Sequence, residues 1–130
     1  MNLVDSCGWL EYFGDLPNAP FFSAPIQDAA HLIVPTICIA EVFKRLLIQR
    51  NKVQALQAVM EMRMGIVVDL DTELAVEAAR LSLEHKLPLA DSIILATARL
   101  RQAVIWTQDA HFRQFPGVKF KAAPPKSKFH

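Results

Sequence analysis

Four acidic residues of this chain stand inside or directly after apolar segments, where an isolated carboxylate is costly to bury. They are Asp5 after Leu3-Val4, Glu41 within residues 37–43, Asp91 within residues 87–95 and Asp109 after residues 104–108. Because an unpaired buried charge is strongly unfavourable, such groups are usually paired or bound to a metal ion. If the fold gathers these four carboxylates into one cleft, their mutual repulsion calls for a divalent cation. A cation held by oxygen ligands beside water is suited to phosphodiester hydrolysis.

Length and composition predict one compact domain. The chain has 130 residues, which is within the usual range for a single domain. Hydrophobic residues make up 52% of it, yet no apolar run approaches the roughly 20 residues that span a bilayer. The N-terminus lacks the basic and apolar regions of a secretory signal. We therefore expect a cytoplasmic protein with no membrane partner, a folded domain over residues 1–121 and a disordered basic tail over residues 122–130.

The types of residue present favour oxygen ligands for such a cation. The two cysteines, Cys7 and Cys38, lack the CxxC spacing of a zinc site. The four histidines are scattered along the chain, which argues against imidazole-based metal chemistry: His31, His85, His111 and His130. Carboxylates remain, and they favour Mg²⁺, for which Mn²⁺ can substitute. The net charge of +1 means that nucleic-acid binding would depend on local basic patches.

Short apolar runs alternate with amphipathic segments along the chain. We predict strands over residues 2–5, 33–34, 66–70, 104–106 and 118–120, and helices over residues 7–13, 26–30, 36–50, 52–64, 72–85 and 90–101. Thr36 and Asp71 are predicted to cap two of these helices. In the helix over 52–64, apolar side chains recur at helical spacing: Val53, Leu56, Val59 and Met60. The alternation predicts an α/β fold with a central, mainly parallel sheet of four to five short strands covered by helices on both faces.

The predicted elements allow all four acidic residues to face one cleft. Asp5 and Asp109 follow strands, and ligands of parallel sheets bind beyond the carboxyl ends of the strands. Asp91 lies in the first turn of its helix, where the helix dipole favours negative charge, and Glu41 lies in the second turn of another helix.

Each residue also has a simpler interpretation. Asp5 and Asp109 could merely cap the turns that follow them, and Glu41 could pair with Lys44 or Arg45 on the surface. Asp91 lies on the apolar face of its helix, which disfavours a purely solvated role, but it could act as an N-terminal cap. The combination of the four in order is what favours a shared site.

At these residues the chain resembles the PIN-domain ribonucleases and, within them, the VapC toxins of bacterial toxin–antitoxin modules. The matching segments are residues 3–9, 36–42, 89–96 and 106–112, which together span nearly the whole chain. The resemblance implies a PIN-like domain and a Mg²⁺-dependent endoribonuclease acting as the toxin of a type II module. It further implies that the four acidic residues bind the metal and act in catalysis, with Ser6 and Thr107 as supporting hydrogen-bonding groups.

The same resemblance implies two protein partners, a cognate antitoxin and a second copy of the toxin, in a homodimer or a toxin–antitoxin hetero-oligomer. An antitoxin helix could bind in a groove near Trp9, Tyr12, Phe13 and Phe43. Cys7 stands where these toxins often have serine, which implies a site sensitive to oxidation.

Basic side chains around the cleft are candidates for holding RNA, although taken singly each is more simply explained as an ordinary solvated charge. They are Lys44, Arg45, Lys86 and Arg113, with Lys119 and the tail lysines as further candidates. Two alternatives to the nuclease interpretation remain: a phospho-receiver switch, and a catalytically inactive domain that binds RNA or protein. A receiver normally needs an acidic pair after the first strand, where this chain has only Asp5.

Overall fold

The computed structural model describes residues 1–125, and their fold is built on one parallel sheet of five strands in the order β3-β2-β1-β4-β5. The strands are β1 (Asn2–Val4), β2 (Leu32–Pro35), β3 (Ile66–Val68), β4 (Val104–Thr107) and β5 (Lys119–Phe120). Leu3 in the central strand is in register with Ile33 of β2 and Ile105 of β4. All three side chains are buried, because a central parallel strand is covered on both faces.

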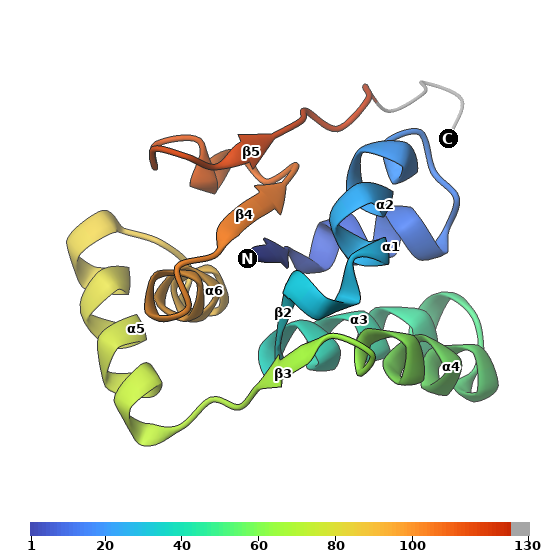
Figure 1. Ribbon diagram of the computed structural model, residues 1–130, viewed down its shortest axis with the longest axis horizontal. Coiled ribbons are helices and arrows are strands. Elements are labelled where there is room, and N and C mark those ends of the chain that lie inside the picture. Colours follow the sequence, from blue (N-terminus) through green and yellow to red (C-terminus); the bar gives the residue numbers. More distant parts are fainter. Residues whose placement is uncertain (126–130) are drawn as a thin grey trace.

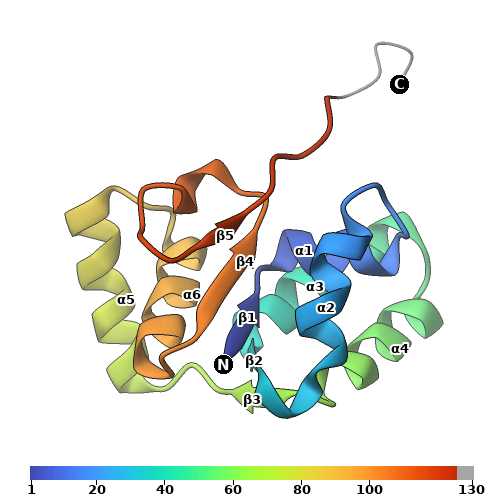
Figure 2. The same cartoon turned by 45° about the horizontal axis from the view of Figure 1, so that its top comes forward.

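Six α-helices connect these strands and flank the sheet (Figure 1). They are α1 (Ser6–Phe13), α2 (Ala19–Gln27), α3 (Thr36–Gln49), α4 (Lys52–Met62), α5 (Thr72–His85) and α6 (Leu89–Leu100), with the short 3₁₀ helices η1 (Ala29–His31) and η2 (Ala110–Phe112). Figure 2 shows α5 and α6 on one side of the strands and α1 to α4 on the other. The predicted α/β class and parallel sheet are confirmed.

Close packing of α1 on α2 depends on Gly8. A Cβ atom built at this glycine would lie 2.5 Å from Cδ1 of Phe22 and 2.7 Å from Cγ1 of Val4. Both neighbours are fully buried, so neither can move away without disturbing the core. Gly8 therefore allows α1 to begin directly after β1, which fixes where Asp5 and Ser6 lie.

Two predicted details of the N-terminal half are wrong. The helix expected over residues 26–30 is instead α2, which starts at Ala19; Pro20 fits its first turn because that turn leaves backbone N–H groups unbonded anyway. The N-cap of α3 is Pro35, not Thr36. Thr36 Oγ1 accepts a hydrogen bond from the Leu70 backbone at 3.3 Å, linking α3 to the segment after β3.

The apolar face predicted for α4 is also wrong. Val53, Leu56 and Met60 are exposed, whereas Ala55, Ala58 and Met62 are buried. Helix α4 packs on α3, and small alanine side chains allow the two helices to approach closely. Val53, Leu56 and Met60 are left on the outer surface.

In the C-terminal half the predictions match the structure closely. Asp71 caps α5 by accepting a hydrogen bond from the Leu74 backbone at 2.9 Å. The predicted stripe of Leu74, Ala78 and Leu81 is buried. Helix α5 packs on α6, which carries Asp91 in its first turn.

The chain after β5 is held to the domain at its first residue, because the Ala122 carbonyl accepts a hydrogen bond from Asn18 Nδ2 at 3.0 Å. Residues 122–125 are exposed, and the tail lysines Lys126 and Lys128 lie outside the described residues. The boundary expected at residue 121 stays a prediction. Among residues 1–125, no helix combines the length and the apolar character needed to cross a membrane.

Candidate metal centre

The four acidic residues come from elements that meet at the point where the strand order reverses. Strand β1 pairs with β2 on one side and with β4 on the other. Asp5 directly follows β1, and Asp109 lies two residues beyond the end of β4. In such sheets the loops leave the reversal point in opposite directions and open a crevice at the carboxyl ends of the strands.

Asp5 is the buried centre of this site, with only 4% of its surface exposed. Its Oδ1 accepts a hydrogen bond from the Ser6 backbone at 2.7 Å and so caps α1, as the simpler interpretation expected. Its Oδ2 accepts a hydrogen bond from Thr107 Oγ1 at 2.8 Å. Burial raises the pKa of Asp5 above its ordinary value despite these hydrogen bonds, and the nearby Asp109 raises it further. Capping alone does not explain a carboxylate that is buried in this way, because burying a charge is costly.

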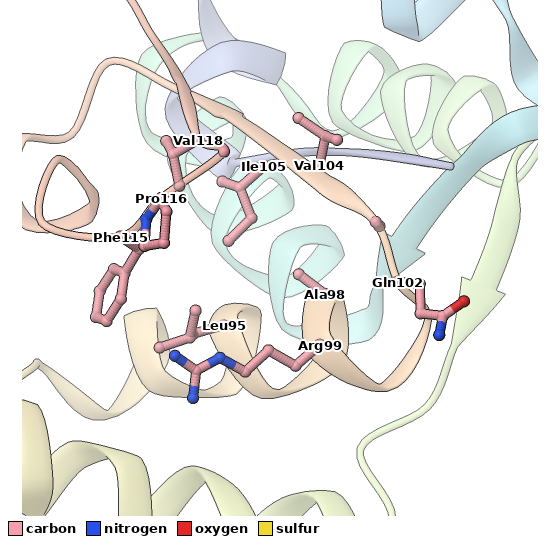
Figure 3. Close-up of a pocket in the computed structure, with 11 residues that line it drawn as sticks. Leu95, Ala98, Arg99, Gln102, Val104, Ile105, Phe115, Pro116 and Val118 are labelled. Carbon is pink, nitrogen blue, oxygen red and sulfur yellow. The ribbon is translucent and has the colours of Figure 1, made fainter.

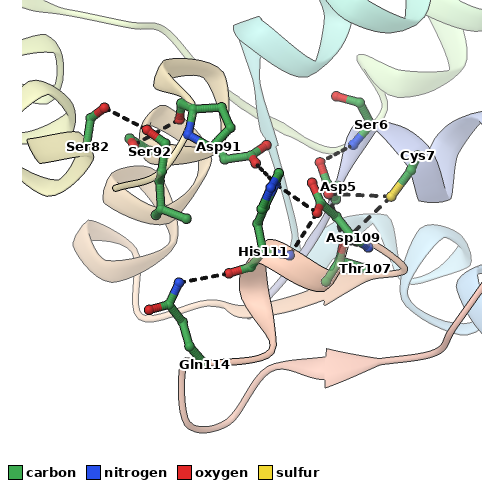
Figure 4. A network of polar contacts seen from close by, with 12 residues as sticks. Asp5, Ser6, Cys7, Ser82, Asp91, Ser92, Thr107, Asp109, His111 and Gln114 are labelled. Carbon is green, nitrogen blue, oxygen red and sulfur yellow. Dashed lines mark hydrogen bonds and ion pairs between the residues drawn. The ribbon is translucent and has the colours of Figure 1, made fainter. Parts of the chain in front are cut away.

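Asp91, Asp109 and His111 form a tight cluster beside Asp5 (Figure 4). His111 Nδ1 lies 3.0 Å from Asp91 Oδ2 and 3.1 Å from Asp109 Oδ1. One potential ligand atom from each of the three lies within 4.8 Å of the others. Burial, followed by the charges of Asp109 and Asp5, raises the pKa of Asp91 to about 6. The carboxylates of Asp5, Asp91 and Asp109 are therefore close enough to interact electrostatically.

Glu41 reaches the same region through Ser6. Ser6 Oγ donates a hydrogen bond to Glu41 Oε1 at 2.7 Å, which links the start of α1 to the second turn of α3. Within residues 1–125, neither Lys44 nor Arg45 forms an ion pair with Glu41. The surface ion pair considered from the sequence is absent there, and Glu41 faces α1.

A groove of about 430 Å³ runs between α1 and α3 beside these residues. It is lined by Ser6, Cys7, Leu10, Glu41, Lys44, Arg45 and Ile48. Lys44 and Arg45 thus border the acidic site.

The other two candidates for holding RNA lie outside this groove. Lys86 is the exposed C-cap of α5, and Arg113 follows η2 with its guanidinium 4.9 Å from the centre of the Phe120 ring.

Cys7 lies against the buried carboxylate. Its Sγ is 3.4 Å from Asp5 Oδ2 and 3.6 Å from Thr107 Oγ1. Burial and the negative charge of Asp5 raise the pKa of this thiol well above its ordinary value. Because the thiolate is the reactive form, the raised pKa disfavours the oxidation sensitivity expected from the sequence.

His111 is a site residue that the sequence reasoning missed. The scattered positions of the histidines argued against imidazole at the site, yet the turn of η2 brings His111 back over Asp109, two residues earlier. An Asp-x-His spacing directly after a strand was the available signal. The contact with Asp91 spans 20 residues and is not visible in the sequence.

A second missed group of residues holds the loop after β4 in place. Glu11 is buried and accepts hydrogen bonds from the Asn18 backbone at 3.1 Å and from Gln108 Nε2 at 3.4 Å. Asn18 Nδ2 donates to Gln108 Oε1 at 3.0 Å. Gln108 is therefore fixed from two sides, immediately before Asp109.

Another cavity, of about 280 Å³, lies away from the carboxylates between α6 and the β4–β5 region (Figure 3). Leu95, Ile105, Phe115 and Val118 give it a mainly apolar lining, with Arg99 at its rim. No acidic residue lines it, so it offers no carboxylate ligand for a cation.

The fold and site define an α/β domain with an acidic cluster at the carboxyl end of its central strand. The chain belongs to the PIN domain family, whose family model matches residues 3–118. The resemblance stated from the sequence is thereby confirmed. No curated protein matches the sequence at a significant level.

Solved structures share this fold over most of their length. A toxin–antitoxin complex from Klebsiella pneumoniae is 24% identical, with a TM-score of 0.76, and the match covers 91% of this chain and 95% of that one. VapC20 of Mycobacterium tuberculosis, a sarcin–ricin loop cleaving toxin, is 13% identical, with a TM-score of 0.78 and coverage of 92% and 98%. A DNA-bound VapBC from Salmonella typhimurium is 17% identical, with a TM-score of 0.74 and coverage of 94% and 98%.

Proposed function

We propose that this chain is a metal-dependent endoribonuclease that acts as the toxin of a type II toxin–antitoxin module in the cytoplasm. The observation that carries the proposal is the convergence of Asp5, Asp91 and Asp109 from β1, α6 and the loop after β4. Membership of the PIN domain family and the fold shared with VapC20 and two toxin–antitoxin complexes support it.

The chemistry of the donor set fits a divalent cation. Carboxylates whose pKa values are raised by burial and by one another are relieved when a cation neutralises them. In the described part of the chain, no Lys or Arg forms an ion pair with the four acidic residues, so only His111 offsets their charge. Asp5, Asp91 and Asp109 would hold Mg²⁺ or Mn²⁺ directly, and Glu41 would complete the set from the Ser6 side.

When bound, the cation would supply an activated water and neutralise charge on the transferring phosphoryl group. The protein's own residues hold this site in shape. Thr107 Oγ1 donates to Asp5 and accepts from the Asp109 backbone at 2.9 Å, so one hydroxyl positions two carboxylates. Ser6 orients Glu41 in the same way. Hydrogen bonds of this kind orient the carboxylates that would bind the metal.

The topology excludes one of the two alternatives to a nuclease, the phospho-receiver, but not the other, an inactive binding domain. A phospho-receiver of the flavodoxin-like class has the strand order 2-1-3-4-5, whereas this sheet has 3-2-1-4-5. The receiver interpretation is therefore rejected on topology. An inactive domain that binds RNA or protein is excluded only by activity, and the cleavage experiment below tests it.

The groove between α1 and α3 fits the amphipathic helix of an antitoxin. Ile48 and Leu10 supply apolar contacts, and Glu41 lies at the same groove to attract a basic antitoxin side chain toward the acidic site. Of the aromatic residues near which the groove was expected, Trp9 is 1% exposed and belongs to the core, so it offers a partner almost no surface. Exposed apolar side chains on α3 and α4, including Leu47, Val53 and Met60, offer surface for a second copy.

The decisive experiment incubates RNA with the purified protein in Mg²⁺ or in excess EDTA. We expect cleavage only with the cation, and Asp5→Asn and Asp91→Asn should each abolish it. Asp28→Asn is the matched control, because Asp28 lies before β2, at the opposite end of the sheet, and pairs with His31 as Asp91 pairs with His111. Full activity of either site variant, or in EDTA, refutes the nuclease assignment.

The toxin role has its own test. Expression of this chain alone should arrest growth, and expression together with the protein encoded next to it should restore growth and yield a complex. A chain that cleaves RNA in vitro but is harmless when expressed alone, with no co-purifying partner, would instead be a housekeeping nuclease.

A further inference from the structure

Basic side chains on and beside the edge strand β5 are held against aromatic rings. Lys119 Nζ lies 4.5 Å from the centre of the Trp106 ring, and Lys121 Nζ lies 5.9 Å from that of Phe21. On the other side of the strand the Arg113 guanidinium lies over Phe120. All three cations are exposed, whereas the rings are half-buried.

This strand is joined directly to the acidic site. The Lys121 backbone donates a hydrogen bond to the Thr107 carbonyl at 3.0 Å, and Trp106 is in register with Lys119. Thr107 is the residue whose hydroxyl binds Asp5. Lys119 and Lys121 therefore lie beside the strand whose last residue, Thr107, holds Asp5.

The charge of this region has one sign. Residues 110–125 contain no acidic residue, and neither does α2, which supplies Phe21. Among the described residues, none of the three cations forms an ion pair with a carboxylate. An exposed basic edge without acidic partners is complementary to a phosphate backbone.

A cation held over a ring is positioned in advance without losing its hydrogen-bond donors. The ring attracts the charge through its quadrupole, and the N–H groups that face away from the ring stay free. Restricting a flexible lysine before binding reduces the entropy lost when it contacts a ligand.

We propose that Arg113, Lys119 and Lys121 form a track that binds the phosphate backbone of single-stranded RNA and leads it to the acidic site. This inference rests on the proposed nuclease function and adds the surface that holds the substrate. It assigns RNA binding to the edge at β5 and leaves Lys44 and Arg45, which line the groove between α1 and α3, to the antitoxin.

Lysines on an edge strand can also serve only to prevent strand pairing between molecules. The two roles are separable. Protection from aggregation requires charge of either sign, so Lys119→Glu and Lys121→Glu would preserve it, whereas RNA binding requires positive charge.

The test measures binding of a fluorescent single-stranded RNA in excess EDTA, which keeps the RNA intact, over a range of salt concentrations. The variant Arg113→Gln/Lys119→Gln/Lys121→Gln should bind about tenfold more weakly at low salt, and the slope of log K against log salt should fall by roughly 2. The matched control Lys52→Gln/Arg63→Gln/Arg101→Gln changes net charge equally at exposed positions outside this edge. Lys119→Arg/Lys121→Arg should retain binding.

Cleavage with Mg²⁺ then separates this inference from the nuclease proposal. The triple glutamine variant should raise KM and leave kcat nearly unchanged, because none of its three residues contacts the carboxylates. Equal binding and equal salt slopes in wild type and triple variant, or an equal loss in the control, overturn the track. Absence of cleavage by a wild type that binds RNA through these residues overturns the nuclease proposal and leaves the track standing.

Discussion

His111 Nδ1 lies between Asp91 and Asp109, 3.0 Å from one carboxylate and 3.1 Å from the other. The two carboxylates repel each other, and the imidazole ring is the one positively chargeable side chain that contacts both within residues 1–125. Both carboxylates raise the pKa of His111, which favours its charged form. The same ring nitrogen can become a metal ligand once it is neutral, since imidazole is a common ligand of transition metals.

His111 should therefore affect which cation the site prefers. A nitrogen ligand favours Mn²⁺ over Mg²⁺, so His111→Asn should weaken Mn²⁺ binding more than Mg²⁺ binding. Isothermal titration calorimetry with each cation measures the two affinities. His31→Asn is the control, because His31 contacts Asp28 at the same 3.0 Å but lies outside the site. An equal loss for both cations, or none, would remove His111 from the ligand set.

Metal binding should stabilise the folded protein. The cation binds the assembled site and not the unfolded chain, so millimolar Mn²⁺ should raise Tm by mass action. Asp91→Asn removes one proposed ligand and should reduce this shift, whereas Asp28→Asn should not. Thermal melting with and without Mn²⁺ measures both. Identical shifts in wild type and Asp91→Asn would place the cation elsewhere.

Without metal, stability should rise as the pH falls from 7 to 5. The folded-state pKa of Asp91 is raised to about 6 from the ordinary 3.8, so the folded protein binds more protons than the unfolded chain in this interval. Charged His111 contributes in the same direction, because its folded pKa is also raised and its stabilising contact is lost at higher pH. Urea unfolding in EDTA at several pH values measures the trend.

Asp91→Asn provides the control for that trend. It removes the carboxyl with the raised pKa, so the free energy of unfolding should depend less steeply on pH between 5 and 7. A wild-type stability that falls on acidification over this interval would contradict the account of the carboxylate cluster.

Thr107 should matter to both stability and activity. It is fully buried, donates to Asp5 and accepts from the Asp109 backbone. Thr107→Val keeps the shape but leaves these polar groups unpaired, which should cost about 1–3 kcal/mol of unfolding free energy. Loss of carboxylate positioning should also lower kcat.

Thr107→Ser retains the hydroxyl and separates the two effects. It should keep most of the activity and lose only the packing of one methyl group. Equal activity of the valine and serine variants would show that the hydroxyl does not position the carboxylates.

Local sequence determined the elements and their ends wherever the deciding contacts are between neighbours in the chain. Asp71 caps α5 by bonding Leu74, three residues on, and the apolar stripe that follows is buried as the helical spacing predicts. Asp5 and Asp109 were placed after strands for the same reason. The order of short strands and helices was sufficient for the parallel α/β class.

Only the tertiary structure decided which side chains meet. Ser6 and Glu41 are 35 residues apart, and His111 and Asp91 are 20 apart, so neither contact leaves a periodic signal in the sequence. The outward face of α4 was likewise decided by its packing on α3, which buries Ala55 and Ala58 and leaves Val53 exposed. Helical spacing specifies that a face exists, but the neighbouring element determines which face is covered. Long-range packing is therefore what brings the four carboxylates and the histidine together at the carboxyl end of the sheet.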